Sequence, residues 1–339
     1  MTTTYSAWLV TQRGHPAQVL QLKGDLPIPT KLARGNVLVK VQAVASILGY
    51  KLMGAVPNFL ARRPQVAEQD LAGVVVDPNG SEYSVGDKVF GSTTKHGVLA
   101  EYVEISSQSI VRVPPNISAV EAAGLGTVVA TADQALALLK VQSGQTVFVN
   151  GGSSSVGLAA IQIAKSFGCK VVSSASGKNK GRLLNLGVDE FLDYTQAPLA
   201  EHLTSNPPSP KFHAIFDAVG LTDPSLYLKS AAYLAPGGLY VTSGPWPRTR
   251  KEFAGVLRQV FEGWLRPTWL GGVPRKYVFL LVKFERKDLE TVRDSVAKGA
   301  VKPIVDSVHS FDRDGVLKAY ERIMSKRAVG KVVVKITDE

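Results

Sequence analysis

The segment Thr146-Val-Phe-Val-Asn-Gly-Gly-Ser-Ser-Ser-Val-Gly157 runs from an apolar, strand-like stretch into a tight loop, and helical periodicity follows it. Gly151 allows a turn with positive φ, and Gly157 lets the helix pack closely on its strand. The helix N-terminus would offer N–H groups and partial positive charge to a pyrophosphate. The small residues that let the backbone approach the phosphates are Gly152, Ser153, Ser154 and Ser155. This context predicts dinucleotide binding; the alternative is a tight turn without a ligand.

The end of the following strand indicates which dinucleotide would bind. An NAD site usually has Asp or Glu about 20 residues after the loop to bind the ribose hydroxyls. The stretch from Val171 to Arg182 has no carboxylate, and the next one is Asp189. It offers hydroxyl, amide and cationic groups that suit a 2′-phosphate: Ser174, Ser176, Lys178, Asn179, Lys180 and Arg182. We therefore expect NADPH; alternatively, these cations simply face water at a helix start.

The regions on either side of this segment differ in pattern. Strands and helices alternate towards the C-terminus, which predicts βαβ units and a parallel sheet. The first third of the chain has short strands separated by Gly, Pro and Asn turns, which is typical of a small β-rich domain. Between the two, Ser118 and Glu121 have capping-box spacing and predict a helix start. The β-rich tail Gly330–Ile336 is expected to return to the first domain, giving an α/β protein of two domains.

Composition excludes several classes of protein. The 339 residues carry 39 Lys+Arg and 28 Asp+Glu, a net charge of +11, but no compact basic run, so we expect no specific nucleic-acid partner. No apolar run reaches the roughly 18 residues of a membrane span. The start, Met1–Val10, is neither a secretory signal nor Arg-rich. With Cys169 as the one cysteine, an intramolecular disulfide is impossible. We expect a cytoplasmic protein, with a mitochondrial location left open.

Taken in order, the motifs of the chain resemble those of the medium-chain dehydrogenase/reductase superfamily. Within it, the chain is similar to the zinc-free quinone oxidoreductases (zeta-crystallin-like) and the enoyl reductases, over nearly its whole length. The stretches that carry the resemblance are Gly14–Leu20, Asp70–Val75, Val85–Gly91, Val149–Gly157, Leu186–Asp189 with Asp193 and Tyr194, Phe216–Gly220, Ala235–Gly238 and Gly330–Val334. Each is weak by itself, but the ordered series is specific.

The resemblance implies a GroES-like domain at 1–122 and 300–339 and a Rossmann domain at 123–299. It also implies a cofactor in the cleft and a homodimer. Carried over by position, the pyrophosphate contacts are Ser153, Ser154, Ser155 and Val156, and the 2′-phosphate contacts are Ser176, Lys178, Lys180 and Tyr194. Val219 and Gly220 would lie along the adenosine ribose, and Thr127, Phe279 and Lys331 near the nicotinamide. The chain departs from many relatives in having serine at Ser154 and Ser155, where N–H groups and added hydroxyls should still bind phosphate.

No zinc site is expected. Related zinc alcohol dehydrogenases use Cys and His ligands, whereas this chain has one cysteine and five histidines without metal-ligand spacing. Hydride transfer to an acceptor that is already polarised is then easier than alcohol oxidation. Tyr50 and Lys51 match the segment that lines the cleft in the family, and either could donate a hydrogen bond to the acceptor oxygen. Alternatively, Tyr50 is an ordinary half-buried aromatic residue, and Lys51 is solvated or contacts the cofactor.

Residues 244–276 hold Trp246, Trp264 and Trp269, together with seven cations and two carboxylates. Apolar residues recur at helical spacing in this segment: Phe253, Val256, Leu257, Val260, Phe261, Trp264 and Leu265. We expect this face to pack on the Rossmann domain, as most amphipathic helices do. The alternatives are peripheral contact with a membrane surface, a lid over an apolar substrate, or a dimer contact. In each case the segment favours a hydrophobic small-molecule substrate.

Together these patterns predict an NADPH-dependent oxidoreductase that reduces a quinone or an α,β-unsaturated carbonyl without zinc. An enoyl reductase serving a biosynthetic chain would differ only in substrate. The alternative from another class is a non-catalytic, nucleotide-responsive binding or membrane-surface protein that uses residues 244–276.

Overall fold

The computed structural model describes residues 3–46, 53, 58, 59, 61, 63–245, 247 and 249–337. The chain divides into two compact units, each described here by itself: unit 1 is Met1–Ala130 with Lys283–Glu339, and unit 2 is Thr131–Val282. The sequence predicts a first domain of residues 1–122 with 300–339, whereas the observed division also assigns residues 123–130 and 283–299 to unit 1.

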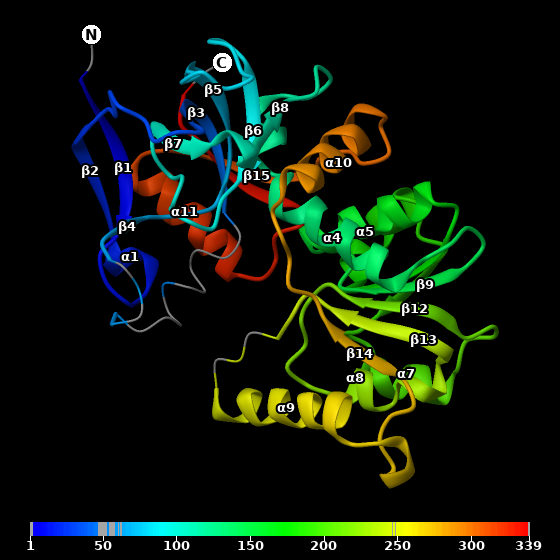
Figure 1. Ribbon diagram of the computed structural model, residues 1–339. Helices are drawn as coiled ribbons and strands as arrows, with labels where there is room; N and C mark the ends of the chain where they lie inside the picture. Colours follow the sequence, from blue (N-terminus) through cyan, green and yellow to red (C-terminus); the bar gives the residue numbers. More distant parts are fainter. Residues whose placement is uncertain are drawn as a thin grey trace. The chain divides into compact units, whose positions relative to one another are not determined.

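Unit 1 is built on two β-sheets (Figure 1). The larger has the order β15-β16-β3-β5-β6-β8, with β7 also paired to β3, and the smaller is β2-β1-β4. The strands are β1 (Thr4–Val10), β2 (Leu20–Pro27), β3 (Asn36–Ser46), β4 (Gln65–Val66), β5 (Asp70–Asp77), β6 (Lys88–Ser92), β7 (Tyr102–Ser106), β8 (Ile110–Arg112), β15 (Val305–Ser310) and β16 (Lys331–Lys335). β16 pairs antiparallel with β3, which confirms that the C-terminal tail returns to the first domain.

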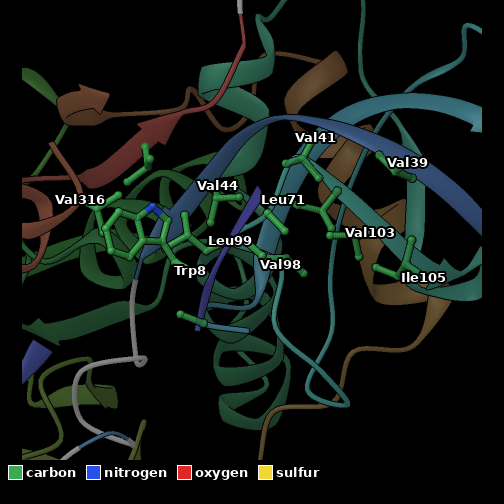
Figure 2. Packing of buried hydrophobic residues seen from close by; sticks show 14 of the residues in the cluster. Trp8, Val39, Val41, Val44, Leu71, Val98, Leu99, Val103, Ile105 and Val316 are labelled. Atoms are coloured by element: carbon green, nitrogen blue, oxygen red, sulfur yellow. The ribbon is translucent and has the colours of Figure 1, made fainter. Parts of the chain in front are cut away.

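Among the described residues, unit 1 also contains the helical elements α1 (Pro16–Val19), η1 (Ser107–Ser109), α3 (Ala119–Ala123), α10 (Arg286–Ala297) and α11 (Arg313–Met324). The predicted capping box is confirmed, because Ser118 and Glu121 cap α3 reciprocally. The core of unit 1 contains buried apolar residues of β3, β5 and β7 together with Trp8 of β1 (Figure 2). The indole of Trp8 is buried and donates to the carbonyl of Phe311 at 2.8 Å, which ties the β-rich core to the start of α11.

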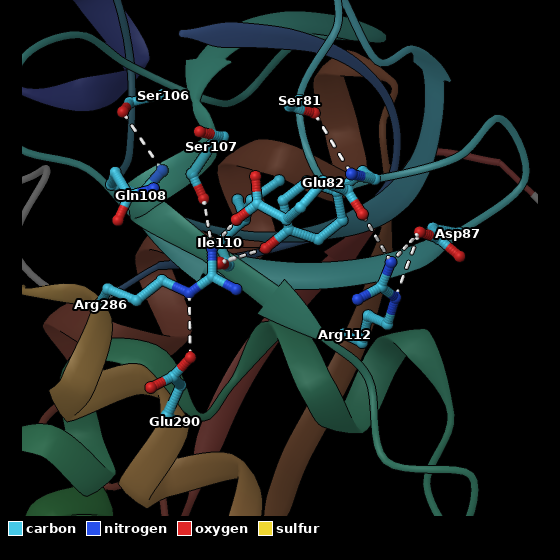
Figure 3. A network of polar contacts seen from close by, with 11 residues as sticks. Ser81, Glu82, Asp87, Ser106, Ser107, Gln108, Ile110, Arg112, Arg286 and Glu290 are labelled. Carbon is cyan, nitrogen blue, oxygen red and sulfur yellow. Dashed lines mark hydrogen bonds and ion pairs between the residues drawn. The ribbon is translucent and has the colours of Figure 1, made fainter.

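Polar contacts explain why α10 belongs to unit 1 (Figure 3). The Arg286 guanidinium forms ion pairs with Glu82 and with Glu290, the latter at 3.0 Å, and donates to the carbonyl of Ser107 at 3.2 Å. It also lies 5.7 Å from the ring centroid of Tyr83. Sequence periodicity alone cannot assign α10 to a unit, because Glu82, Tyr83 and Ser107 lie far from it in the chain.

Unit 2 contains a six-stranded parallel sheet of order β11-β10-β9-β12-β13-β14 (Figure 1). Its strands are β9 (Thr146–Asn150), β10 (Lys170–Ala175), β11 (Glu190–Asp193), β12 (Phe212–Asp217), β13 (Leu234–Thr242) and β14 (Lys276–Phe279). The chain builds outward from β9 in one direction and from β12 in the other. This reversal between adjacent strands is the topological switch point of a Rossmann fold, where ligands bind at the carboxyl ends of the strands.

The helical elements of this half of the chain include α4 (Gly126–Leu139), which crosses the unit boundary. The others are α5 (Ser155–Ser166), η2 (Gly177–Asn179), α6 (Lys180–Asn185), α7 (Leu199–Ser205), α8 (Ser225–Leu228), η3 (Ser230–Ala232), α9 (Arg250–Val260), the π-helical turn η4 (Phe261–Leu265) and η5 (Thr268–Leu270). Within the described ranges, no helix is both long and apolar enough to cross a membrane.

The amphipathic segment does not pack as predicted. Phe253, Leu257 and Phe261 are exposed, whereas Gln259 is the buried residue of α9. The expectation that the apolar face packs on the Rossmann domain is therefore wrong for most of that face; Val256 and Val260 are only half-buried. The apolar face is exposed because the shape of the neighbouring elements, and not the apolar spacing, determines which face of α9 packs on unit 2.

Candidate functional site

The candidate site lies at the carboxyl edge of the unit 2 sheet, around the loop between β9 and α5. Gly151 has φ of +79°, so the positive φ predicted for it is confirmed. A Cβ added at Gly157 would overlap the carbonyl oxygen of Gly151, and one added at Gly152 would overlap the hydroxyl of Ser173. The close approach of helix to strand predicted from Gly157 is therefore confirmed. These glycines form a cradle that any side chain would fill.

Ser154 caps α5 and closes this loop on itself. Its hydroxyl donates to the carbonyl of Gly151 at 2.8 Å and accepts from the N–H of Gly157 at 3.0 Å. Its own N–H donates to Gly151 at 2.9 Å. The Ser154 hydroxyl thus holds the loop, which corrects the expectation that it adds a phosphate contact. Among the described residues, the N–H groups of Ser153 and Val156 form no hydrogen bond, so they are the donors that an anion would find.

A chain of buried side chains links four neighbouring strand ends beneath the loop. The Ser174 hydroxyl donates to Asn150 Oδ1 at 2.7 Å and accepts from the N–H of Gly151 at 3.1 Å. Asn150 Nδ2 donates to Asp217 Oδ1 at 2.9 Å, and the Thr242 hydroxyl donates to Asp217 Oδ2 at 3.1 Å. Ser174 is fully buried. This corrects its predicted direct contact with a 2′-phosphate: its hydroxyl positions the loop instead.

Asp217 is the centre of this chain and was missed as a site residue in the sequence. Besides Asn150 and Thr242, its carboxylate accepts from the N–H groups of Val219, Gly220 and Leu221 at 3.2, 3.2 and 2.8 Å. Burial raises the pKa of Asp217, and these hydrogen bonds act in the opposite direction. The signal in the sequence was an acidic residue directly after the apolar run Ala214–Phe216 of β12, where burial without partners would be costly.

Val219 and Gly220 lie next to the cradle, and their place along the adenosine ribose stays a prediction. The Val219 side chain is half exposed and occupies the space into which a Cβ of Gly151 would project. Gly220 has φ of +71°, and a Cβ there would overlap the carbonyl oxygen of Gly244. Their N–H groups are bound to Asp217, so the surface that they offer to a ligand is apolar.

The predicted 2′-phosphate residues follow the end of β10. Lys178, Lys180 and Arg182 are exposed on η2 and α6. Asn179 is buried and its amide donates to the hydroxyl of Ser176 at 3.1 Å, so these two residues shape the turn. Tyr194 is exposed, and its N–H reaches the carbonyl of Ala175 at 3.4 Å, which brings it to the end of β10.

Asp193 also lies beside this turn, and the sequence pattern did not reveal it. Its carboxylate accepts from the Thr195 hydroxyl at 2.6 Å, from the Thr195 N–H at 2.9 Å and from the N–H of Gly177. The Thr195 hydroxyl holds the pKa of Asp193 below its usual range. The expectation of a carboxylate-free turn is therefore wrong in space, although it holds along the chain. The parallel pairing of β10 with β11 brings the end of β11 alongside.

The three residues predicted near the nicotinamide lie in different units. Phe279 ends β14 in unit 2, and its ring blocks the space beside Gly244. Thr127 and Lys331 meet in unit 1 at the buried carboxylate of Asp70. The Thr127 hydroxyl donates to Asp70 at 2.6 Å, and Lys331 Nζ lies 3.3 Å from it. Burial lowers the pKa of Lys331, and Asp70 opposes that effect.

Two further predictions concern catalysis and metal. Tyr50 and Lys51 lie outside the described residues, as do Trp246 and Arg248 of the segment 244–276. In the ranges that the structure describes, no three His, Cys, Asp or Glu residues are grouped so that they could hold a metal ion. Cys169 is buried, and burial raises its pKa.

Comparisons with known proteins agree with this architecture. A family model described as zinc-binding dehydrogenase matches residues 186–334. The whole chain is 32% identical to a trans-enoyl reductase of Penicillium oxalicum, of which it covers 99%. It is 27% identical to a chloroplastic NADPH-dependent alkenal/one oxidoreductase of Arabidopsis thaliana, over 97% of this chain and 78% of that protein. The structure of a quinone oxidoreductase from Coxiella burnetii matches 98% of this chain and 100% of its own, with a TM-score of 0.82 and 25% identity.

Proposed function

Because the chain belongs to the medium-chain dehydrogenase/reductase superfamily, in its enoyl reductase branch, we propose that it uses NADPH to reduce an activated C=C bond or a quinone. The relatives make it an oxidoreductase with a GroES-like and a Rossmann unit. We further propose that NADPH is the cofactor, that an activated C=C bond or a quinone is the acceptor, and that the reaction needs no zinc.

The observation that carries the proposal is the phosphate cradle at the switch point of the unit 2 sheet. Glycines at 151, 152 and 157 leave no room for side chains, and the N-terminus of α5 supplies the N–H groups of Ser153 and Val156. Such a helix terminus binds a pyrophosphate through aligned N–H donors and the helix dipole. Asp217 and Ser174 hold the loop in this shape before any ligand arrives.

The preference for NADPH rests on the turn after β10. Lys178 and Lys180 are exposed cations in the position where a 2′-phosphate would add negative charge. The negative charge of the nearby Asp193 carboxylate opposes the attraction of these lysines for a phosphate, but Thr195 and Gly177 already donate hydrogen bonds to its oxygens. It is therefore less able to accept from a ribose hydroxyl, which is the contact that selects NADH.

The residues of this chain would bind the cofactor, orient the acceptor beside it and polarise the acceptor. A bound NADPH would supply the hydride. The exposed apolar side chain of Val219 would pack beside it at the edge of the cradle. The acceptor needs a hydrogen-bond donor at its carbonyl oxygen, and Tyr50 and Lys51 are the residues we propose for that role. With a single cysteine in the sequence, a thiolate-rich zinc site of the alcohol dehydrogenase kind cannot form.

The test is a coupled binding and turnover measurement on the full chain. NADPH and NADH affinities are measured first, and NADPH oxidation is then followed with a panel of enones, enoyl thioesters and quinones. We expect tighter binding of NADPH and turnover with at least one acceptor class. NADPH binding without turnover across the panel would favour the non-catalytic alternative, and equal or absent binding of both nucleotides would overturn the proposal.

The homodimer and the cytoplasmic location stay predictions. Light scattering of the purified chain measures the first, and fractionation of cells measures the second. A monomer at all concentrations would contradict the assembly expected from the resemblance without affecting the proposed reaction.

A further inference from the structure

Seven large apolar side chains are exposed on one short stretch of unit 2, where α9 continues into η4 and η5. We call them the α9 stripe. Each is between 51 and 81% exposed: Phe253, Leu257, Phe261, Trp264, Leu265, Trp269 and Leu270. Large apolar side chains that are exposed together on one surface often mark an interaction site. Figure 1 shows α9 in yellow beside α8.

The opposite face of the same helix packs on unit 2, and it is the less apolar face. A Cβ at Gly255 would overlap the carbonyl oxygen of Thr222, and one at Gly263 would lie 3.0 Å from Tyr277 Cβ. Between them, Gln259 is buried, and neither its amide oxygen nor its amide nitrogen has a hydrogen-bond partner. Residues 255, 259 and 263 recur every four positions and lie across the helix from residues 253, 257 and 261.

This orientation is unfavourable in water alone. Rolling the helix would bury aromatic side chains and hydrate the amide of Gln259, and both changes are favourable. The observed arrangement instead keeps the backbone of α9 close to unit 2 through Gly255 and Gly263. The Trp264 indole also donates to the carbonyl of Tyr277 at 3.3 Å, which fixes the roll of η4. The fold thus holds the stripe outward, as a surface that meets an apolar partner would require.

Positive charge lies close to the stripe: helical spacing places Arg250 and Arg258 on or beside it, and Lys251 lies in the first turn of α9. Arg250, Lys251 and Arg258 are exposed on α9 and form no ion pair within the described residues. The two carboxylates nearby are already engaged: Glu262 pairs with Arg266 at 3.1 Å, and Glu252 caps the helix with Thr249. This positive charge therefore attracts an anionic partner, and the net charge of +11 acts in the same direction.

These features select one occupant. A second copy docking through the same stripe would bring unpaired cations of both copies together, and such like-charge contacts are unfavourable. A bilayer with anionic headgroups offers apolar interior and negative charge at once, and aromatic residues favour its interface. We propose that the α9 stripe binds the surface of anionic membranes, with α9 lying in the interfacial plane. This goes beyond the proposed reductase activity and does not depend on it.

Co-sedimentation with vesicles tests the proposal on the full chain. The vesicles are phosphatidylcholine alone, or phosphatidylcholine with phosphatidylserine. We expect binding to the mixed vesicles that weakens with salt, and little binding to the neutral ones. Replacing the cations (R250E, K251E and R258E together) should weaken binding by at least about 100-fold, because three attractions to the anionic surface are lost and three repulsions are added. Replacing stripe residues (W269S with L270S, or F253S with L257S) should abolish it at any salt.

Matched controls separate the stripe from general charge and hydrophobicity. K23E with K31E changes exposed cations of unit 1, and L22S with F167S changes exposed apolar residues outside the stripe. Both controls should bind like the original chain, and all variants should keep its thermal unfolding. Absence of binding to mixed vesicles overturns the proposal, as does equal loss in the K23E/K31E control. A dimer that the stripe variants dissociate would identify a second copy as the occupant, and a raised KM without any vesicle binding would identify a lid.

Discussion

At the scale of single residues, Asp217 does most to shape the candidate site. It is fully buried, and five donors from three segments converge on its two oxygens. A carboxylate so satisfied can stay in the interior, and its partners are held in one geometry. Two of them, Asn150 and Val219, contact the loop that would bind the pyrophosphate. Asp217 is therefore a positioning residue for that loop.

Replacing Asp217 with asparagine should weaken both folding and nucleotide binding. The new NH2 group would face N–H donors, so we expect a loss of about 2 kcal/mol in the free energy of unfolding, the usual value for hydrogen bonds to a charged group. Denaturant titration and NADPH affinity measure the two effects. D25N, at an exposed site, is the control. If D217N lowered stability but left the NADPH affinity unchanged, Asp217 would be structural only.

Lys178 and Lys180 should set the preference between nucleotides. We expect K178A and K180A each to weaken NADPH binding by about 1 kcal/mol, because each removes one exposed charge contact with the 2′-phosphate. NADH affinity should not change, and K229A is a control at an exposed lysine of the same unit. D193N should have the opposite effect and strengthen NADPH binding. Equal losses for both nucleotides would contradict this assignment.

At the scale of elements, the junction between β9 and α5 combines backbone geometry with packing. The helix starts at Ser155 because Ser154 caps it, and it ends near Gly168, whose φ is +76°. Both ends are properties of local sequence. The closeness of α5 to its strand is local as well, because it requires Gly157 to sit directly against the carbonyl of Gly151 in the same loop.

A pair of glycine variants tests that closeness. G157A should displace the loop, lower the free energy of unfolding by about 1–3 kcal/mol and weaken NADPH binding. G181A lies in α6, where an added Cβ meets nothing within 4 Å, and should raise stability by about 0.5–1 kcal/mol. Thermal unfolding and NADPH titration of both variants provide the comparison. A G157A protein with normal affinity would show that the cradle tolerates a side chain.

An ion pair between α11 and β15 makes the free energy of unfolding depend on pH. Arg322 donates twice to Asp306 at 2.7 Å, and this contact lowers the pKa of Asp306 below its ordinary 3.8. A carboxyl group whose pKa is lower in the folded state stabilises the fold at pH values above its ordinary pKa. This stabilisation is lost as the pH falls through the pKa of the folded state. D306N should therefore cost about 2 kcal/mol at neutral pH and nothing in strong acid. Denaturant titrations from neutral pH down to pH 2 measure the difference.

At the scale of the whole molecule, the cofactor site described lies within one unit. The cradle, the Asp217 chain and the turn with Lys178 all belong to unit 2, whereas Asp70, Thr127 and Lys331 form a separate buried polar cluster in unit 1. Each unit has its own hydrophobic core. Ligand binding to unit 2 should therefore stabilise that unit by mass action.

We expect NADPH at 100 times its dissociation constant to add about 2.7 kcal/mol to unit 2 and to raise its melting temperature by about 5–10 °C. NADH at the same concentration should shift it less. Calorimetry gives the shift, and hydrogen exchange should show protection at residues 151–157 and 176–180. Equal shifts for the two nucleotides would argue against the 2′-phosphate site.

Features that depend on consecutive residues were predictable from the sequence alone. The positive φ of Gly151, the tight contact at Gly157, the capping box at Ser118 and the parallel sheet each follow from neighbouring residues or from a short period. The family motifs added the GroES-like and Rossmann identities of the two domains, and they pointed to Val219 and Gly220.

Long-range geometry could be read only from the folded chain. Ser174 turned inward to Asn150, Asp193 arrived from the adjacent strand, and Asp217 gathered donors from separate segments, because lateral hydrogen bonds join strands that are distant in sequence. The outward face of α9 has the same origin. Periodicity shows that a helix has an apolar face, but which face meets the protein depends on the close fit of Gly255 and Gly263 against partners elsewhere in the chain.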